Sequence, residues 1–153
     1  MSLFSRQKHA KQKGTALLEL ALVWPLLSLV LLGVIDFGRI FYASIEVTNA
    51  AHAGVQYGAR SLTLANDTAG MQTAATNDAV DTSGMTSSAN YTCRCPGTPL
   101  TVSCGMALSA CGPSSPYELY VTVTTQKSVT PMFPWPGIPN PIVVNSTATM
   151  RAK

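Results

Sequence analysis

The stretch Gly14-Thr15-Ala16-Leu17-Leu18-Glu19-Leu20 opens an apolar run that continues to Ile35. Residues 20–35 carry no charge, and with residues 15–18 they are long enough to cross a bilayer core of about 30 Å as a helix. A charged side chain at the centre of such a helix costs about 2.5–3.5 kcal/mol, and less near the interface, where Glu19 lies. The sequence therefore predicts a transmembrane helix over residues 15–35 whose glutamate serves a function.

The basic residues gather before this helix. The formal net charge is +3, but four of the ten basic residues precede the apolar run: Arg6, Lys8, Lys11 and Lys13. The rest of the chain has the other six basic residues and seven acidic residues. It is therefore nearly neutral and offers no basic surface for nucleic acid. Because positive residues favour the cytoplasmic side, we expect residues 1–14 to form a basic cytoplasmic leader and the rest to be extracytoplasmic.

A cleaved signal peptide and an ordinary uncleaved anchor are the alternatives for this N-terminal region. A signal peptide has an apolar region of about 7–15 residues that is followed closely by an A-x-A-like cleavage site. The triplet of this kind is Ala51-His52-Ala53, sixteen residues beyond Ile35. This spacing disfavours cleavage by signal peptidase.

The residues around Gly14 resemble the processing site of type IV prepilins, in which a basic leader and a glycine precede an apolar helix with glutamate at its fifth position. Further matching residues follow along the chain: Ala21, Trp24-Pro25, Gly33, Asp36-Phe37-Gly38-Arg39, Asn49-Ala50-Ala51 and Gly58-Ala59-Arg60. Over residues 14–62 the chain resembles the TadE-like pseudopilins of tight-adherence (Tad) pilus systems. The resemblance implies that an inner-membrane prepilin peptidase cuts after Gly14 and makes Thr15 the first residue.

The same resemblance implies roles for Glu19 and Pro25 in assembly. In the family, the glutamate pairs with the terminal ammonium of a neighbouring subunit, which satisfies a carboxylate that is otherwise costly to bury. The alternative is that Glu19 snorkels to the lipid headgroups. Pro25 removes a hydrogen bond to the Ala21 carbonyl and should kink or locally melt the helix. The resemblance associates a helix break at this depth with subunits that leave the bilayer. The alternative is that Pro25 only bends a membrane helix.

Apolar and small residues spaced three or four apart predict that the helix continues through residues 36–62 as the spine of a head. The head would comprise residues 63–153, with a short helix over residues 69–80. Residues 81–116 are rich in Ser, Thr, Gly and Pro and are predicted to form a loop. This loop holds all four cysteines, which predict two disulfides of undetermined pairing or, alternatively, a zinc site: Cys93, Cys95, Cys104 and Cys111.

Two segments with alternating apolar residues, 117–125 and 142–150, predict an antiparallel pair of strands. The loop between them, residues 128–141, contains five prolines and the apolar side chains of Phe133 and Trp135. These aromatics are a candidate interface for a partner or a membrane surface, and the alternative is that they fold back on the core. The predicted fold class is α+β: a long N-terminal helix and a small, disulfide-stapled, pilin-like head.

No catalytic motif is found in the sequence, so we expect no enzyme, no cofactor, no metal site, no small-molecule substrate and no nucleic-acid partner. The predicted function is that of a TadE-like minor pilin in assembly of a Tad pilus for adhesion. Its partners would be the prepilin peptidase, other pilins and the Tad machinery of a bacterial inner membrane. The alternative is a permanently anchored extracytoplasmic binding or adhesion module.

Overall fold

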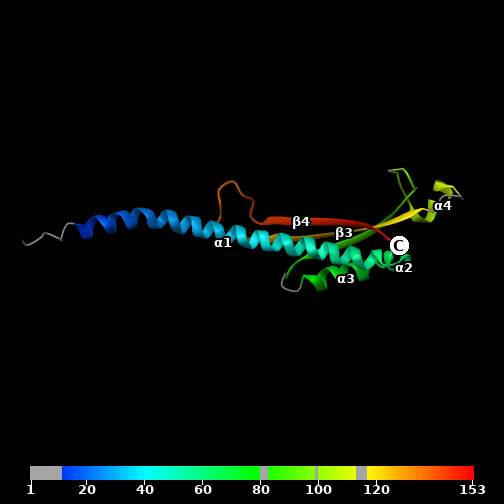
Figure 1. Cartoon of the computed structure of the whole chain (residues 1–153), viewed down its shortest axis with the longest axis horizontal. Coiled ribbons are helices and arrows are strands. Elements are labelled where there is room, and N and C mark those ends of the chain that lie inside the picture. Colours follow the sequence, from blue (N-terminus) through cyan, green and yellow to red (C-terminus); the bar gives the residue numbers. More distant parts are fainter. Residues whose placement is uncertain (1–11, 80–82, 99, 113–116) are drawn as a thin grey trace, which may run out of the picture. The chain divides into compact units, whose positions relative to one another are not determined.

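The computed structural model describes residues 12–79, 83–98, 100–112 and 117–153. Most of the predicted leader, residues 1–11, lies outside them. The elements are shown in Figure 1 and follow in chain order: α1 (Gln12–Ala59), α2 (Leu62–Ala65), α3 (Thr68–Asp78), β1 (Thr86–Arg94), β2 (Thr101–Val102), the 3₁₀ helix η1 (Cys104–Met106), α4 (Ala107–Cys111), β3 (Glu118–Val129) and β4 (Ile142–Arg151). The chain divides within α1, between Gly38 and Arg39, into two compact units.

The first unit contains the N-terminal part of α1, which is apolar on all sides. Between Leu17 and Ile35, fourteen large apolar side chains are 40–79% exposed. A helix that is apolar all round needs a lipid or protein environment on every side. In length and composition α1 is the helix of the described chain that is able to cross a membrane. The predicted long apolar N-terminal helix is confirmed.

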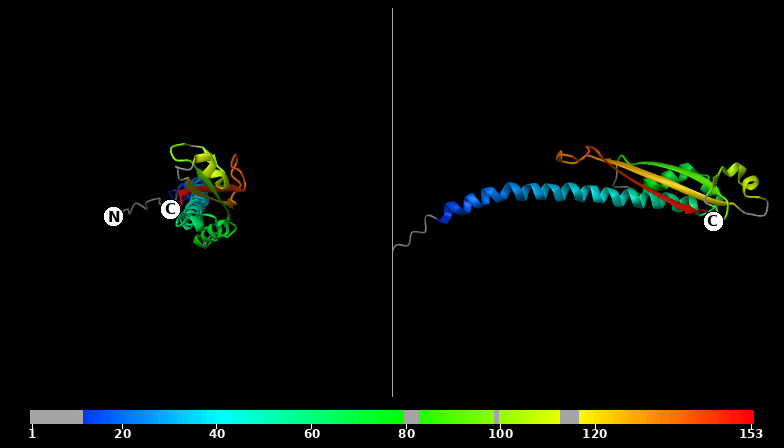
Figure 2. Two further views of the ribbon diagram at one scale, coloured as in Figure 1. Left: turned by 90° about the vertical axis from the view of Figure 1, so that its right-hand side faces the viewer. Right: turned by 90° about the horizontal axis from the view of Figure 1, so that it is seen from above.

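The second unit, residues 39–153, is the head, and it is built on a four-stranded antiparallel sheet. The strand order is β2-β1-β3-β4. Along β3, Leu119 lies opposite Cys93 of β1, and Val123 lies between Ala89 of β1 and Ala148 of β4. In the left view of Figure 2, helix α3 and the part of α1 that belongs to the head lie on one side of these strands.

The core of the head lies between that face of the sheet and the helices. Its larger members, all fully buried, come from α1, α3 and β3: Val55, Met71, Val121 and Val123. Alanines fill most of the remaining core positions, so the layers approach closely. Thr125 is also fully buried on this face, and its hydroxyl donates a 2.7 Å hydrogen bond to the Val47 carbonyl of α1.

The opposite face of the sheet is polar. Threonines of β3 and β4 pair across it, with Oγ1–Oγ1 distances of 3.0 Å for Thr122–Thr149 and for Thr124–Thr147. Threonine is β-branched and suits a pleated strand, and its hydroxyl group forms a hydrogen bond with the threonine opposite on the neighbouring strand. This face is therefore stable in contact with water.

The predicted α+β class is confirmed, including the C-terminal antiparallel sheet and the disulfide-stapled head. The prediction that residues 81–116 form a loop with little regular structure is wrong, because they contain β1, β2, η1 and α4. The residues of β1 that contribute to the core side are the small Ser87, Ala89 and Cys93, while Tyr91 is exposed. A strand that packs small side chains against a close helix lacks the Val and Ile pattern that marks strands in a sequence.

Two helix boundaries also differ from the prediction. Helix α1 ends at Ala59 instead of residue 62, because Ser61 takes an extended conformation and caps α2 by accepting a hydrogen bond from the Leu64 amide. Helix α3 begins at Thr68, where the Asp67 side chain accepts a 2.8 Å hydrogen bond from the Gly70 amide.

Candidate processing and assembly segment

The candidate processing residues lie in the first turns of α1. The helix begins at Gln12, so Gly14 and Thr15 are already helical. A Cβ atom added to Gly14 meets no atom within 4 Å, which shows that open space surrounds this glycine. The backbone after Gly14 is therefore not shielded by other described residues.

Glu19 lies one helical turn after Thr15, and spacing of i to i+4 places the two on the same face of α1. The glutamate is exposed, and its side chain has no hydrogen-bond or ion-pair partner within the described residues. The structure thus brings Thr15 and Glu19 to one face and leaves the carboxylate accessible to a partner.

Pro25 lies inside α1, and the helix continues through it to Ala59. Proline has no amide hydrogen, so the Ala21 carbonyl lacks its usual helical donor. The Ser28 hydroxyl donates a 2.9 Å hydrogen bond to the Pro25 carbonyl. The backbone is therefore weakened at this turn without being broken.

Within the head, α1 also carries apolar side chains that the head does not cover. Phe41 is 68% exposed and Ile45, one turn later, is 59% exposed. On the same part of the helix, Glu46 is half-buried, and its Oε2 atom is buried without a hydrogen-bond partner among the described residues. Exposed aromatic and aliphatic residues on one helix are typical of protein interfaces.

All four cysteines are paired in two disulfides, Cys93–Cys104 and Cys95–Cys111, with Cα–Cα distances of 5.0 and 5.2 Å. This pairing supports the disulfide alternative over zinc, because none of these sulfurs is a free thiolate. The two bridges interleave in the sequence and attach η1 and α4 to the end of β1. Cys93 is fully buried in the core.

The candidate interface residues Phe133 and Trp135 lie in the connection between β3 and β4. Their rings are 5.1 Å apart between centroids and meet edge to face at 66°. Phe133 is 42% exposed, Met132 beside it is 67% exposed, and Trp135 is half-buried. The aromatic side chains therefore form a pair, and the part of the loop around them presents apolar surface to the solvent.

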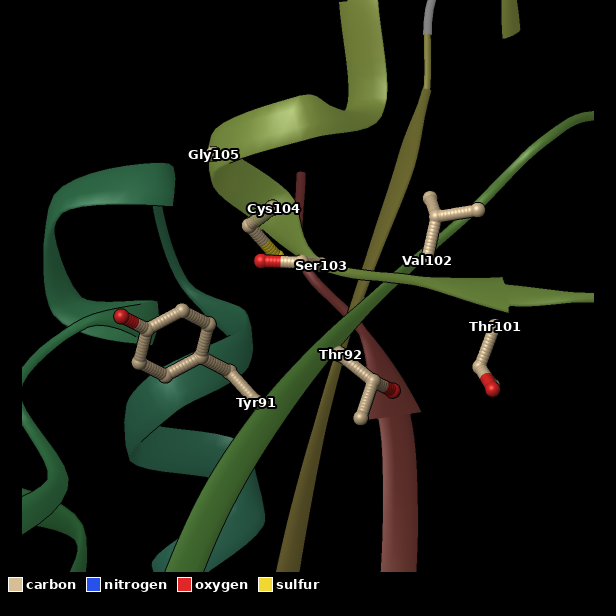
Figure 3. A pocket seen from close by; sticks show the side chains of 7 residues that line it. All are labelled: Tyr91, Thr92, Thr101, Val102, Ser103, Cys104 and Gly105. Atoms are coloured by element: carbon tan, nitrogen blue, oxygen red, sulfur yellow. The ribbon is translucent and has the colours of Figure 1, made fainter. Parts of the chain in front are cut away.

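A shallow hollow of about 470 Å³ lies beside the disulfides. Figure 3 shows its lining, which comprises Tyr91 and Thr92 of β1 and residues 101–105. Hydroxyl groups dominate this lining, and Cys104 contributes a sulfur that is already in a disulfide. Without a second titratable side chain, the hollow lacks a general acid–base pair.

Charged side chains gather at the end of the sheet near this hollow. Arg151 forms a 2.8 Å ion pair with Glu118, and the Arg94 guanidinium lies 4.8 Å from the centre of the Tyr120 ring. The Tyr120 hydroxyl donates a hydrogen bond to Glu118, which raises the pKa of that phenol above its usual 10.0. The Arg94 Nε atom is buried without a hydrogen-bond partner in the described chain. These contacts fasten the start of β3 to its neighbours.

A second phenol with a raised pKa joins α1 to α3. The Tyr57 hydroxyl donates a 3.0 Å hydrogen bond to Asp67, and this bond raises the pKa of Tyr57 above 10.0. Among the described residues, no group of His, Cys, Asp and Glu is arranged to hold a metal ion.

Sequence reasoning missed the glycines that let α1 approach the rest of the head. A Cβ atom at Gly54 would lie 2.8 Å from the Met71 carbonyl oxygen, and one at Gly58 would overlap the Met71 sulfur. The spacing of four between these glycines is the signal in the sequence that marks a close helix contact.

In a comparison with protein families, the model of the family described as TadE-like protein matches residues 14–56. The match covers the candidate processing segment and most of α1, and it ends before the sheet begins. Comparison with curated proteins and with solved structures gives no match.

Proposed function

We propose that this chain, which is a TadE-like protein by its residues 14–56, is a minor pilin that is cut after Gly14 and takes part in assembling a Tad pilus. Its partners in this proposal are a prepilin peptidase, other pilins and the Tad machinery. The precursor is held in the bacterial inner membrane by residues 15–35, with a cytoplasmic N-terminus and an extracytoplasmic head.

The observation that carries the proposal is the exposed carboxylate of Glu19 in an otherwise apolar helix. A carboxylate in such surroundings is stable only with a cation or strong hydrogen-bond donors. Cleavage after Gly14 creates an ammonium group at Thr15, which supplies a cation one helical turn from Glu19 on each neighbouring subunit. Pairing Glu19 with that group therefore stabilises association of subunits and selects those that have been cut.

Two further observations support assembly through α1. Phe41 and Ile45, on the part of α1 that belongs to the head, are exposed apolar side chains that a neighbouring subunit can cover. In addition, Ala51 of the alternative signal-peptidase triplet is fully buried in a continuous helix, which is a poor protease substrate. The head of more than one hundred residues favours a minor subunit over a shaft subunit made of little more than a helix.

A permanently anchored binding module remains the second candidate. The hollow lined by hydroxyl groups of Tyr91, Thr92 and Ser103 favours it, since such a lining suits a small polar ligand. In that case neither Gly14 nor Glu19 has a role beyond anchoring.

Substitutions at Gly14 and Glu19 test the proposal. We expect Gly14→Ala to block maturation, because prepilin peptidase reads the glycine, while the fold is unchanged, since open space surrounds this position. Glu19→Ala should leave cleavage intact and reduce piliation. Gly38→Ala is the matched control, because it makes the same change in the same helix, also in open space. Normal piliation with both Gly14→Ala and Glu19→Ala would refute assembly through this segment.

A further inference from the structure

The connection between β3 and β4, residues 130–141, is chemically unlike the rest of the head surface. No charged residue occurs between Lys127 and Arg151, and five of the residues from 131 to 141 are prolines. Met132 and Phe133 are 67% and 42% exposed. We call residues 130–141 the proline loop. It combines exposed apolar side chains with few backbone donors, because proline has no amide hydrogen.

The packing of β3 on α1 fixes which end of the head carries the proline loop. A Cβ atom at Gly58 would contact Val121, one at Gly54 would contact Val123, and Thr125 bonds to the carbonyl of Val47. Strand β3 therefore advances toward earlier residues of α1. The loop that follows Val129 leaves the sheet at the end of the head where α1 enters it.

That end of the head is tied by the chain to the apolar segment. Arg39 is the first residue of the head and follows Ile35 by four residues, which span about 6 Å of helix. Helix α4, in contrast, is bridged through Cys111 to Cys95, the residue that follows the last residue of β1, and that end of β1 pairs with the start of β3. Figure 1 shows the proline loop in orange at one end of β3 and β4, and α4 at the other.

We propose that the proline loop lies in the interfacial layer of the membrane that α1 spans, with Met132, Phe133 and Trp135 among the lipid headgroups. Tryptophan is enriched at this depth, where its ring is amphipathic and its indole N–H reaches water or headgroups. Entry of a charge-free segment into this layer desolvates no charged group. The inference rests on the membrane anchoring in the proposed function, and it adds a second lipid contact that belongs to the head.

The Phe133–Trp135 pair makes the contact compact. The rings meet edge to face at 5.1 Å, so they enter the interface as one apolar unit. Amphipathic helices that lie in this layer insert their apolar face by about 5–10 Å, which sets the scale for such a contact. In this proposal the head contacts the bilayer through the proline loop, in addition to its covalent link to the membrane-spanning segment.

Tryptophan fluorescence of the full chain in phospholipid vesicles tests the inference. The chain contains two tryptophans, so Trp24→Phe leaves Trp135 as the sole emitter. We expect lipids brominated near the headgroup to lower its emission roughly twofold, as a ring in the interfacial layer requires. Lipids brominated at the chain terminus should quench it weakly, and iodide in the aqueous phase should not reach it.

The matched control moves the emitter to the other end of the head. In Trp24→Phe with Trp135→Phe and Leu108→Trp, the new ring replaces a side chain of α4 that is 67% exposed. Iodide should quench it and brominated lipids should not.

Two results overturn the inference alone: Trp135 quenched by iodide, or Trp135 shielded from both quenchers, which would mean that it packs on protein. A chain that fails to float with the vesicles would overturn the membrane anchoring of the proposed function as well.

Discussion

Replacement of Gly54 by alanine is the sharpest test of how the head is packed. Gly54 lies in α1 where this helix contacts both α3 and β3. An added Cβ atom would lie 2.8 Å from the Met71 carbonyl oxygen, 3.0 Å from Val123 Cγ1 and 3.1 Å from Ala75 Cβ. The nearest of these atoms belongs to the backbone of α3, so no rotamer change relieves the contact, and α3 must move away from α1.

The size of the effect follows from two opposing terms. Overpacking of a close contact costs about 1–3 kcal/mol, and a backbone neighbour places Gly54→Ala in the upper half of that range. Alanine in place of glycine inside a helix stabilises the folded state by about 1 kcal/mol. We therefore expect a net loss of about 1–2 kcal/mol, which raises the unfolded fraction of the head by a factor of about 5–30.

Hydrogen exchange measured by mass spectrometry on β3 peptides of the detergent-solubilised chain provides the assay, because β3 is the central strand of the head. Gly54→Ala should accelerate exchange there by the same factor. Gly38→Ala, for which no neighbour lies within 4 Å, should leave β3 unchanged. A Gly54→Ala head that is as stable as the native head, or more stable, would refute the close packing of α1 on α3.

Three further outcomes follow from the head. Replacing Cys95 and Cys111 by serine should lower the stability of the head by about 3 kcal/mol, which is the loop-closure entropy lost for a separation of 16 residues. The assay is again hydrogen exchange of the β3 peptides, and an unchanged exchange rate would contradict the disulfide. Thr125→Val should lose about 1 kcal/mol, because it removes a buried 2.7 Å hydrogen bond to α1; a gain in stability would count against that bond. The hydrogen bond from Tyr57 to Asp67 raises the pKa of the Tyr57 phenol, so its contribution to stability is complete below pH 10.0 and is lost as the pH rises through the raised pKa. An absorbance titration should show two late-ionising phenols, Tyr57 and Tyr120, of which Tyr57→Phe removes one.

The sequence was sufficient for the parts of the fold whose patterns are strong. The uninterrupted apolar run predicts the N-terminal part of α1, and the alternation of Leu119, Val121 and Val123 predicts β3. Such patterns work because one face of each element must be buried, and large apolar residues mark that face. The composition around the cysteines likewise predicts disulfides, although the pairing depends on which strands bring the sulfurs together.

The missed features depend on contacts between elements distant in the sequence. Strand β1 is hidden because Ala89 and Cys93 occupy positions where a close helix leaves room only for small side chains. Gly54 is required because the Met71 backbone lies close to it. Thr125 can be buried because its hydroxyl bonds to the carbonyl of Val47, which is 78 residues away in the sequence. The candidate processing segment shows the opposite case: Gly14 and Glu19 lie within six residues, so local sequence was enough to propose roles for them, and those roles stay predictions.

The central claim is that this chain is a precursor cut after Gly14. Its most direct test is the intact mass and N-terminal sequence of the protein recovered from membranes of cells with and without the prepilin peptidase. The account predicts a chain that begins at Thr15 when the peptidase is present and at Met1 when it is absent. A chain that begins at Met1 in both strains would contradict the account and would favour a permanently anchored binding module.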